Sequence, residues 1–312
     1  MSQAVVNFDV IIIGGGAAGL SAGLWCDEVG LNALLLEEKN ELGGQLLWTY
    51  NAIKNHLGSE AENGRELRDI FLKQIERRKF AIQLSSEIVK IDLENKIVLL
   101  KDGEICAKTI VIATGVSRRR LNIAGEEKFK NKGIIESGKR DQDFVNGKNA
   151  AIIGGGDAAF ENALILAETA KSVFLIHRNA DFRARAEFIE QAANNPKIKI
   201  LTNSIVQKII GNKNVEAVEL KDVQTGKTQT LSVEAILLRV GVEPSTKLVS
   251  GQIDLDKNGY IKINHNCETS INGVFAIGDV ANPLAPTISS SVGMGATVAK
   301  VIFELLKAKS DV

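Results

Sequence analysis

Short apolar runs alternate with polar, glycine-rich turns at the start of the chain. The run Val10–Ile13 predicts a buried strand, and three consecutive glycines follow it. Residues 18–26 are mostly apolar and predict a helix, and Ala33–Leu36 predicts a second buried strand that ends at Glu37. A strand, a glycine turn, a helix and a strand that ends at an acid are the parts of a dinucleotide-binding βαβ unit.

The glycine turn has the spacing G-x-G-x-x-G, carried by Gly14, Gly16 and Gly19. In this fingerprint the first glycine forms the tight turn, the second lets backbone approach a pyrophosphate, and the third lets the helix touch the strand. Glu37 lies 23 residues beyond Gly14, where a carboxylate accepts hydrogen bonds from a ribose 2′-OH and repels a 2′-phosphate. The alternative is a glycine-rich turn in an ordinary α/β domain.

The same pattern begins again 140 residues later. The turn Gly154–Ala159 is preceded by the apolar run 151–153 and followed by a predicted helix, 160–169, and a predicted strand, 172–176. This strand ends at His177 and Arg178 instead of an acid, with Arg183 and Arg185 close behind. Arginines at this place favour a 2′-phosphate, and hence NADP(H) over NAD(H). The alternative is that these arginines are only the charged start of a helix.

The rest of the pattern places the second unit inside the first. The predicted elements are an amphipathic helix at 64–80, short strands within 81–108, a strand at 110–113, strands within 197–238, a strand at 274–277 and a helix at 289–307. The polar segment 117–133 and the turn 241–244 would carry the chain between domains. We therefore predict one domain from residues 1–116 and 246–312, and a second domain from residues 117–245.

The amino-acid composition bears on the partners and the location of the protein. The 312 residues are 45% hydrophobic with zero net charge, which gives no reason to expect nucleic acid or an acidic membrane surface as a partner. No apolar run approaches the about 18 residues of a spanning helix, and no export signal is visible. The three cysteines, Cys26, Cys106 and Cys267, are far apart in sequence, so we expect neither a disulfide framework nor a metal site, and a cytoplasmic location.

The chain resembles the low-molecular-weight thioredoxin reductases, which are class II FAD/NAD(P)-dependent pyridine nucleotide-disulfide oxidoreductases. The motifs that carry the resemblance are GGGAAG at Gly14–Gly19, GGQL at Gly43–Leu46, ATG at Ala113–Gly115, GGGDAA at Gly154–Ala159 and GDV at Gly278–Val280. The resemblance implies an α/β fold with two Rossmann-like, three-layer ββα domains, the second inserted in the first. It also implies a homodimer, FAD in the first domain and NADPH in the second, with NADH as the alternative.

The resemblance assigns residues to both cofactors and no residue to a metal. The FAD residues would be Gly14, Gly16, Ala17, Ala18, Gly19, Glu37, Gly44, Gln45, Asn55, Thr114, Gly115, Gly278 and Asp279, the last on the ribityl chain. The NADP residues would be Gly154, Gly156, Asp157, Ala158, His177, Arg178 and Arg183. The family's second arginine after the histidine is Asn179 here, which weakens recognition of the phosphate.

The sequence departs from the family at its reaction centre. The two cysteines of the family's C-x-x-C fall on Ser137 and Arg140, while the acid that follows survives as Asp141. Thiol–disulfide exchange needs a thiolate, which neither replacement supplies. The family's Arg-Gln pair before the last helix also differs, because Pro286 and Thr287 stand there.

We therefore expect an FAD-dependent NAD(P)H oxidoreductase without disulfide reductase activity. Its reduced flavin would pass electrons to a non-disulfide acceptor, namely oxygen, a quinone, another flavin or an iron–sulfur protein. Ser137, Arg140 and Asp141 are the candidate catalytic residues: Arg140 would stabilise an anionic reduced flavin or dock an acidic partner, and Asp141 would donate a proton. The alternative is that these side chains fill the space of the lost cysteines and pair with each other.

Two other functions stay open. One is a ferredoxin–NADP reductase, although such proteins usually add a C-terminal aromatic ring, and this chain has no aromatic residue after Phe303. The other is a non-catalytic flavoprotein that serves as a redox sensor or binding module. In each case the expected partner is a small redox protein or a small molecule.

Overall fold

The computed structural model describes residues 6–310 and divides the chain into two compact units. The outer unit comprises Met1–Ser117 and Glu243–Val312, and the inserted unit comprises Arg118–Val242. The two segments that connect the units carry β7 (Val116–Arg118) and β16 (Val242–Pro244), which pair as a two-stranded sheet. Residues 1–5 and 311–312 of the first predicted domain lie outside the description.

A seven-stranded sheet forms the centre of the outer unit, in the order β3-β2-β1-β6-β5-β4 with β17 also paired to β6. The strands β1, β2, β3, β6 and β17 are parallel, whereas β4 and β5 form an antiparallel extension. Their bounds are β1 Val6–Ile13, β2 Ala33–Leu36, β3 Ala81–Gln83, β4 Ile88–Asp92, β5 Ile97–Leu100, β6 Gly103–Ile112 and β17 Val274–Ala276. Because the strands are apolar on both faces, a hydrophobic core lies on each side of the sheet.

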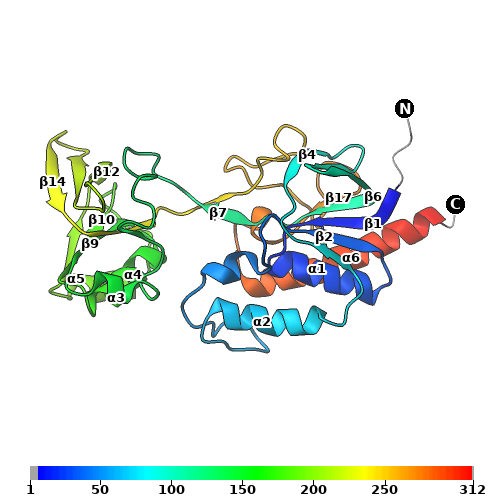
Figure 1. Cartoon of the computed structure of the whole chain (residues 1–312), viewed down its shortest axis with the longest axis horizontal. Helices are drawn as coiled ribbons and strands as arrows, with labels where there is room; N and C mark the ends of the chain where they lie inside the picture. The colour runs from blue at the N-terminus through cyan, green and yellow to red at the C-terminus, as the bar shows by residue number, and fades with distance from the viewer. Residues whose placement is uncertain (1–5, 311–312) are drawn as a thin grey trace. The chain divides into compact units, whose positions relative to one another are not determined.

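Helices α1 (Ala17–Glu28) and α6 (Ile288–Ser310) belong to one of these cores and lie side by side (Figure 1). Gly295 of α6 allows the close approach, because a Cβ there would lie 2.6 Å from the Cβ of Ser21 and 2.7 Å from the nitrogen of Ala22. The remaining helical segments of the unit are η1 (Gly44–Trp48), α2 (Gly64–Ile75) and η2 (Gly278–Val280).

By length and composition alone, Ile288–Ala308 of α6 is apolar enough to cross a membrane. This is weak evidence for a membrane span, because core helices of soluble proteins meet the same criterion. Val298, Ala299 and Ile302 of α6 are fully buried in the outer unit, which accounts for the apolar composition on that side of the helix.

The helix expected over 64–80 ends at Ile75, so the sequence-based boundary is wrong by a full turn. Tertiary contacts explain the early end. The backbone N–H of Lys79 donates to Asp27 over 3.1 Å, and the Phe80 ring packs where a Cβ on Gly23 would lie, 2.5 Å from the ring. These contacts with α1 turn the chain toward β3 before the amphipathic pattern is exhausted.

The inserted unit has a five-stranded parallel sheet in the order β11-β10-β9-β15-β8. A separate three-stranded antiparallel sheet, β12-β13-β14, packs over it through a shared apolar core. The bounds are β8 Ile134–Ile135, α3 Gln142–Val145, β9 Asn149–Gly154, α4 Asp157–Ala167, β10 Ser172–Ile176, α5 Ala186–Ala193, β11 Ile198–Leu201, β12 Ser204–Ile210, β13 Ala217–Asp222, β14 Thr228–Ser232 and β15 Ala235–Arg239. The expected α/β class with two dinucleotide-binding units is thus confirmed.

The close contact of α1 with α6 gives a stability prediction. Gly295→Val should lower the free energy of unfolding by about 1–3 kcal/mol, because the added side chain overlaps Ser21 and Ala22. Gly293, on the same helix, has open space at its Cβ position, so Gly293→Ala should be neutral or stabilise by up to about 1 kcal/mol. Urea unfolding of both variants measures the difference, and equal midpoints for Gly295→Val and the original chain would contradict the packing.

Candidate functional site

The first glycine turn joins β1 to α1 at the carboxyl end of the outer sheet. A Cβ on Gly19 would clash with the carbonyl oxygen of Gly14, so the third glycine does allow the helix to touch the strand. Gly16 caps α1 without a side-chain hydrogen bond, whereas α2 is capped by Asn63, which accepts from the N–H of Glu66 over 3.1 Å. The first N–H groups of α1, from Ala17 and Ala18 onward, are therefore available to an anion.

Glu37 lies where the fingerprint requires, at the end of β2, and it is buried. Its carboxylate accepts hydrogen bonds from the N–H of Gly15 over 2.7 Å and from the N–H of Lys39 over 2.9 Å. Each carboxylate oxygen has a second lone pair that a ribose hydroxyl could use. Glu37 therefore stabilises the glycine turn through Gly15, and its carboxylate can still accept the hydrogen bond predicted from a ribose.

Three further glycine and acid positions converge on the same turn. A Cβ on Gly44 would lie 2.9 Å from the Cα of Gly16, and a Cβ on Gly278 would lie 2.9 Å from the Cβ of Ala18. The amide of Gln45 donates to the Asp279 carboxylate over 2.9 Å. The segments that contain Gly44 and Gly278, more than 200 residues apart, thus both approach the start of α1 through glycines, which have no side chain.

Burial raises the pKa of Asp279, although hydrogen bonds from Gln45 and Ser291 act in the opposite direction. A half-buried carboxylate with two side-chain donors suits a ligand that offers hydroxyl groups. Thr114 and Gly115 follow β6 at this edge, where the Thr114 hydroxyl donates to the carbonyl oxygen of Ser245 over 2.9 Å. Asn55 is exposed in the loop between η1 and α2.

The second glycine turn, between β9 and α4, repeats the arrangement in the inserted unit. Gly154 lies against the carbonyl oxygen of Arg239, and Gly156 caps α4 with open space at its Cβ position and no side-chain cap. Asp157 at the helix start accepts from the backbone N–H and side chain of Arg185 over 2.8 and 3.1 Å. The backbone carbonyl of Ala158 accepts from the amide of Asn162 over 2.7 Å.

His177, Arg178 and Arg183 gather at the end of β10. The His177 ring lies against Gly155, and its Nε2–H donates to the carbonyl of Asp181 over 3.1 Å. Burial lowers the pKa of His177, and the charges of Arg178 and Arg183 lower it further. Over residues 6–310, no ion pair engages the guanidinium groups of Arg178 and Arg183, so both are available to a phosphate.

The loop after β8 holds the three candidate catalytic residues. Ser137 is buried, and its hydroxyl accepts from the N–H of Arg140 over 3.4 Å. Arg140 binds Asp141 through two hydrogen bonds of 2.7 and 2.9 Å and binds Glu136 over 3.0 Å. The structure thus brings the three residues together: Arg140 is ion-paired with Asp141 and Glu136, and its N–H donates to Ser137.

Asp141 is held as a carboxylate by this network. Burial alone would raise its pKa, but the hydrogen bonds from Arg140 and from the N–H groups of Ser137 and Glu136 outweigh burial and leave the pKa below its ordinary value of 3.8. A lowered pKa works against the hypothesis that Asp141 donates a proton, because a general acid must hold its proton near neutral pH.

The cysteines are free and buried in the outer unit. Burial raises the pKa of Cys26 to about 12 and that of Cys267 to about 11, and it also raises the pKa of Cys106. Thiols with such values hold almost no thiolate at neutral pH, so they are poor nucleophiles.

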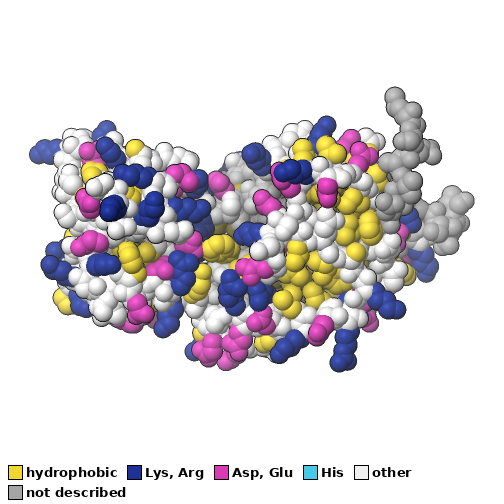
Figure 2. Space-filling view, viewed as in Figure 1, with side chains coloured by type: hydrophobic (Ala, Val, Ile, Leu, Met, Phe, Trp, Pro, Cys, Tyr) yellow, Lys and Arg dark blue, Asp and Glu magenta, His cyan; other side chains and the backbone are white. Residues whose placement is uncertain are grey.

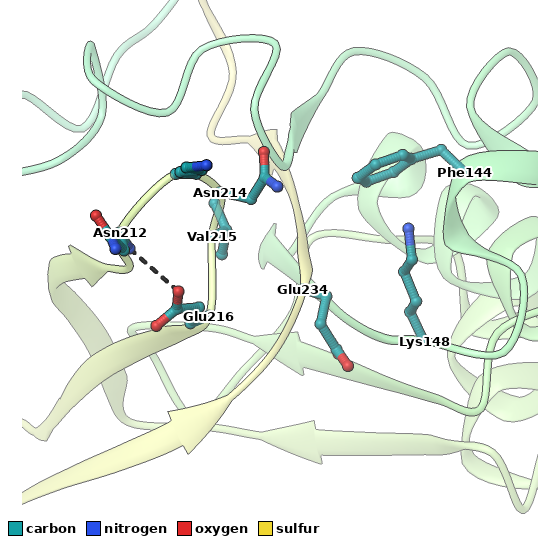
Figure 3. A pocket seen from close by; sticks show the side chains of 8 residues that line it. Phe144, Lys148, Asn212, Asn214, Val215, Glu216 and Glu234 are labelled. Carbon is teal, nitrogen blue, oxygen red and sulfur yellow. Dashed lines mark hydrogen bonds between the residues drawn. The ribbon is translucent and has the colours of Figure 1, made fainter.

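A hollow of about 400 Å³ lies elsewhere on the inserted unit. Figure 3 shows Phe144 and Lys148 on one side and the turn Asn212–Asn214 on the other, with Glu234 between. Lys148 and Glu234 come just before β9 and β15, so this hollow lies at the amino ends of these strands. It is therefore separate from the second glycine turn, which follows the carboxyl end of β9.

One charged residue of the second site was missed by the sequence analysis. Arg239 ends β15 and pairs in register with Gly154 at the glycine turn. An arginine that directly follows the apolar run 235–238 was the available signal, since a charge at the end of a buried parallel strand faces the ligand edge of a sheet.

Comparisons of the sequence and of the structure with known proteins lead to the same family. The family described as pyridine nucleotide-disulphide oxidoreductase matches residues 8–299. A thioredoxin reductase of Mycolicibacterium smegmatis is 34% identical over 298 residues, which are 95% of each chain, and a 34.2 kDa protein in the rubredoxin operon of Clostridium pasteurianum is 33% identical over 96% of each. The crystal structure of Lactococcus lactis thioredoxin reductase covers 97% of this chain and 100% of its own, with 31% identity and a TM-score of 0.86.

The loop network predicts a pH-dependent stability. Because the folded-state pKa of Asp141 is depressed, its contribution is present above the unfolded pKa near 3.8 and is lost as the pH falls through the folded value. Asp141→Asn should therefore cost about 1–2 kcal/mol at pH 7, kept modest by the partial exposure of Arg140, and the cost should shrink below pH 4. Denaturant unfolding at both pH values, with the exposed Asp143→Asn as the control, measures this; a cost that is the same at both pH values would contradict it.

Proposed function

Since the chain belongs to the pyridine nucleotide-disulphide oxidoreductase family, we propose that it is an FAD-dependent NADPH oxidoreductase without disulfide reductase activity. Bound FAD would supply electrons to a non-disulfide acceptor such as oxygen, a quinone, another flavin or an iron–sulfur protein. The family and the fold support FAD and NADPH as the cofactors. The side chains of the loop after β8 support an acceptor that is not a disulfide.

The observation that carries the proposal is the identity of the side chains in that loop. Ser137 and Arg140 occupy the positions where the resemblance places a pair of thiols, and Arg140 is bound to Asp141 and Glu136. No cysteine lies in the inserted unit, and the three of the outer unit are buried with raised pKa values. Thiol–disulfide exchange therefore lacks its nucleophile.

The outer unit fits FAD. The uncapped start of α1 and the bare backbone of Gly16 and Gly44 would face the pyrophosphate, and Glu37 would hold the adenosine ribose. Asp279, half-buried and bound by Gln45, would accept hydrogen bonds from the ribityl hydroxyl groups. When bound, FAD supplies the two-electron redox chemistry that no side chain of this protein can provide.

The inserted unit fits NADPH. The uncapped start of α4 would bind the pyrophosphate, and Arg178 and Arg183 would bind the 2′-phosphate. The unit carries 20 Lys and Arg residues against 15 Asp and Glu, and Figure 2 shows the positive side chains across its face. This excess favours a polyanionic nucleotide over a neutral ligand.

Anaerobic mixing of the flavin-loaded protein with NADPH tests the proposal. We expect prompt bleaching of the flavin absorbance, followed by reoxidation on addition of a soluble benzoquinone and no reoxidation by oxidised thioredoxin. Prior treatment with iodoacetamide under native conditions should leave both steps unchanged, because the buried thiols hold little thiolate. Efficient turnover of thioredoxin would refute the proposal, and so would a flavin that stays oxidised in NADPH.

Nucleotide preference gives a second test. Arg178→Gln and Arg183→Gln should each raise the Michaelis constant for NADPH roughly tenfold and leave that for NADH unchanged, since each arginine forms charged hydrogen bonds with the 2′-phosphate alone. Lys171→Gln, at the opposite end of β10, is the matched control for loss of a positive charge. Equal effects on NADPH and NADH in the arginine variants would show that these residues do not bind the 2′-phosphate.

A further inference from the structure

Arg239 lies at the carboxyl edge of the inserted sheet, where no motif led us to expect a functional residue. It ends β15, the strand between β9 and β8, and is in register with Gly154. Its backbone carbonyl lies against Gly154, so β15 and the second glycine turn are in direct contact there. A charged side chain at this place is close to any ligand that occupies the turn.

The guanidinium group of Arg239 is fixed by two carbonyl oxygens. It donates to the carbonyl of Leu238 over 2.9 Å and to that of Glu136 over 2.7 Å. Arg118 donates to the same carbonyl of Glu136 over 3.0 Å, so one backbone oxygen accepts from two arginines. Burial and the nearby charge of Arg118 lower the pKa of Arg239 to about 10, which leaves it charged at neutral pH.

The backbone that follows Glu136 is tied to the second glycine turn as well. The N–H of Gly138 donates to the amide oxygen of Asn162 over 2.8 Å, and the amide nitrogen of Asn162 donates to the carbonyl of Ala158 at the start of α4. A Cβ on Gly138 would lie 2.9 Å from that amide oxygen, which shows how closely the segment approaches α4. Arg239 and Asn162 thus fix residues 136–138 from two sides.

The strand order assigns this segment to one half of a dinucleotide. In a doubly wound sheet the nucleotide crosses the carboxyl edge, with its pyrophosphate at the glycine turn. Arg178 and Arg183 follow β10, on one side of β9, so the adenosine half lies there. The nicotinamide half would then lie on the other side, over the ends of β15 and β8, where Arg239 and residues 136–138 are found.

We propose that Arg239 is a positioning residue for the nicotinamide half of the bound nucleotide. By holding the carbonyl of Glu136, it fixes the 136–138 backbone as a wall beside the nicotinamide and its ribose, and the adenosine half does not depend on it. This role rests on the NADPH site proposed above.

Two ligands that differ only in the nicotinamide half test the role. One is tetrahydro-NADP, whose reduced ring is neutral and donates no hydride, and the other is 2′,5′-ADP, which lacks the nicotinamide half. We expect Arg239→Met, measured by calorimetry on the flavin-loaded protein, to bind tetrahydro-NADP roughly tenfold more weakly and 2′,5′-ADP as tightly as the original chain. Arg178→Gln is the matched control and should weaken both ligands.

Arg118→Met provides a second variant if Arg239→Met does not fold. Arg118 is exposed and donates to the same carbonyl, so its loss should weaken tetrahydro-NADP in the same direction by a smaller factor. Equal weakening of both ligands in Arg239→Met, or no change in either, would overturn the positioning role. Failure of the original chain to bind 2′,5′-ADP would instead overturn the NADPH site itself, and this role with it.

Discussion

The whole arrangement depends on the close approach of backbone to backbone where a helix begins at the end of a parallel strand. In the outer unit this contact joins Gly19 to the carbonyl of Gly14, and in the inserted unit it joins Gly154 to α4, since a Cβ on Gly154 would lie 3.1 Å from the Cβ of Ala159. A side chain at either position would push the helix away from the sheet and remove its N–H groups from the edge where a phosphate lies. The absence of a Cβ at a few positions therefore decides whether either unit can bind a nucleotide.

Around each turn, the structure adds charged groups that the turn itself cannot supply. The outer unit places Glu37 and Asp279 at its turn, which suits hydroxyl-bearing groups, whereas the inserted unit places Arg178 and Arg183 there, which suits a phosphate. Two copies of one local pattern thus acquire different preferences from the residues at the ends of neighbouring strands. The difference in charge is what makes one unit a candidate for FAD and the other a candidate for NADPH.

The loop after β8 is held in a defined conformation by charged and polar groups alone. Arg140 is longer than a cysteine and charged, and its charge is balanced within four residues by Asp141 and Glu136. The loop is held by these ion pairs, by Asn162 and by Arg239, none of which involves a sulfur atom. A local network of this kind explains how the segment keeps a defined conformation with Ser137 and Arg140 in it.

Local sequence patterns were enough to predict the two glycine turns, the strands around them and the acid or arginine that follows each second strand, because periodicity and spacing fix these features. The sequence could not determine the end of α2 at Ile75, since contacts of Lys79 and Phe80 with α1 end that helix against its own pattern. Nor could it show that Gln45 meets Asp279, or that Arg239 holds the carbonyl of Glu136, because these pairs are separated by 234 and 103 residues. Such contacts arise only when distant strands are placed side by side, and that placement is a property of the tertiary structure.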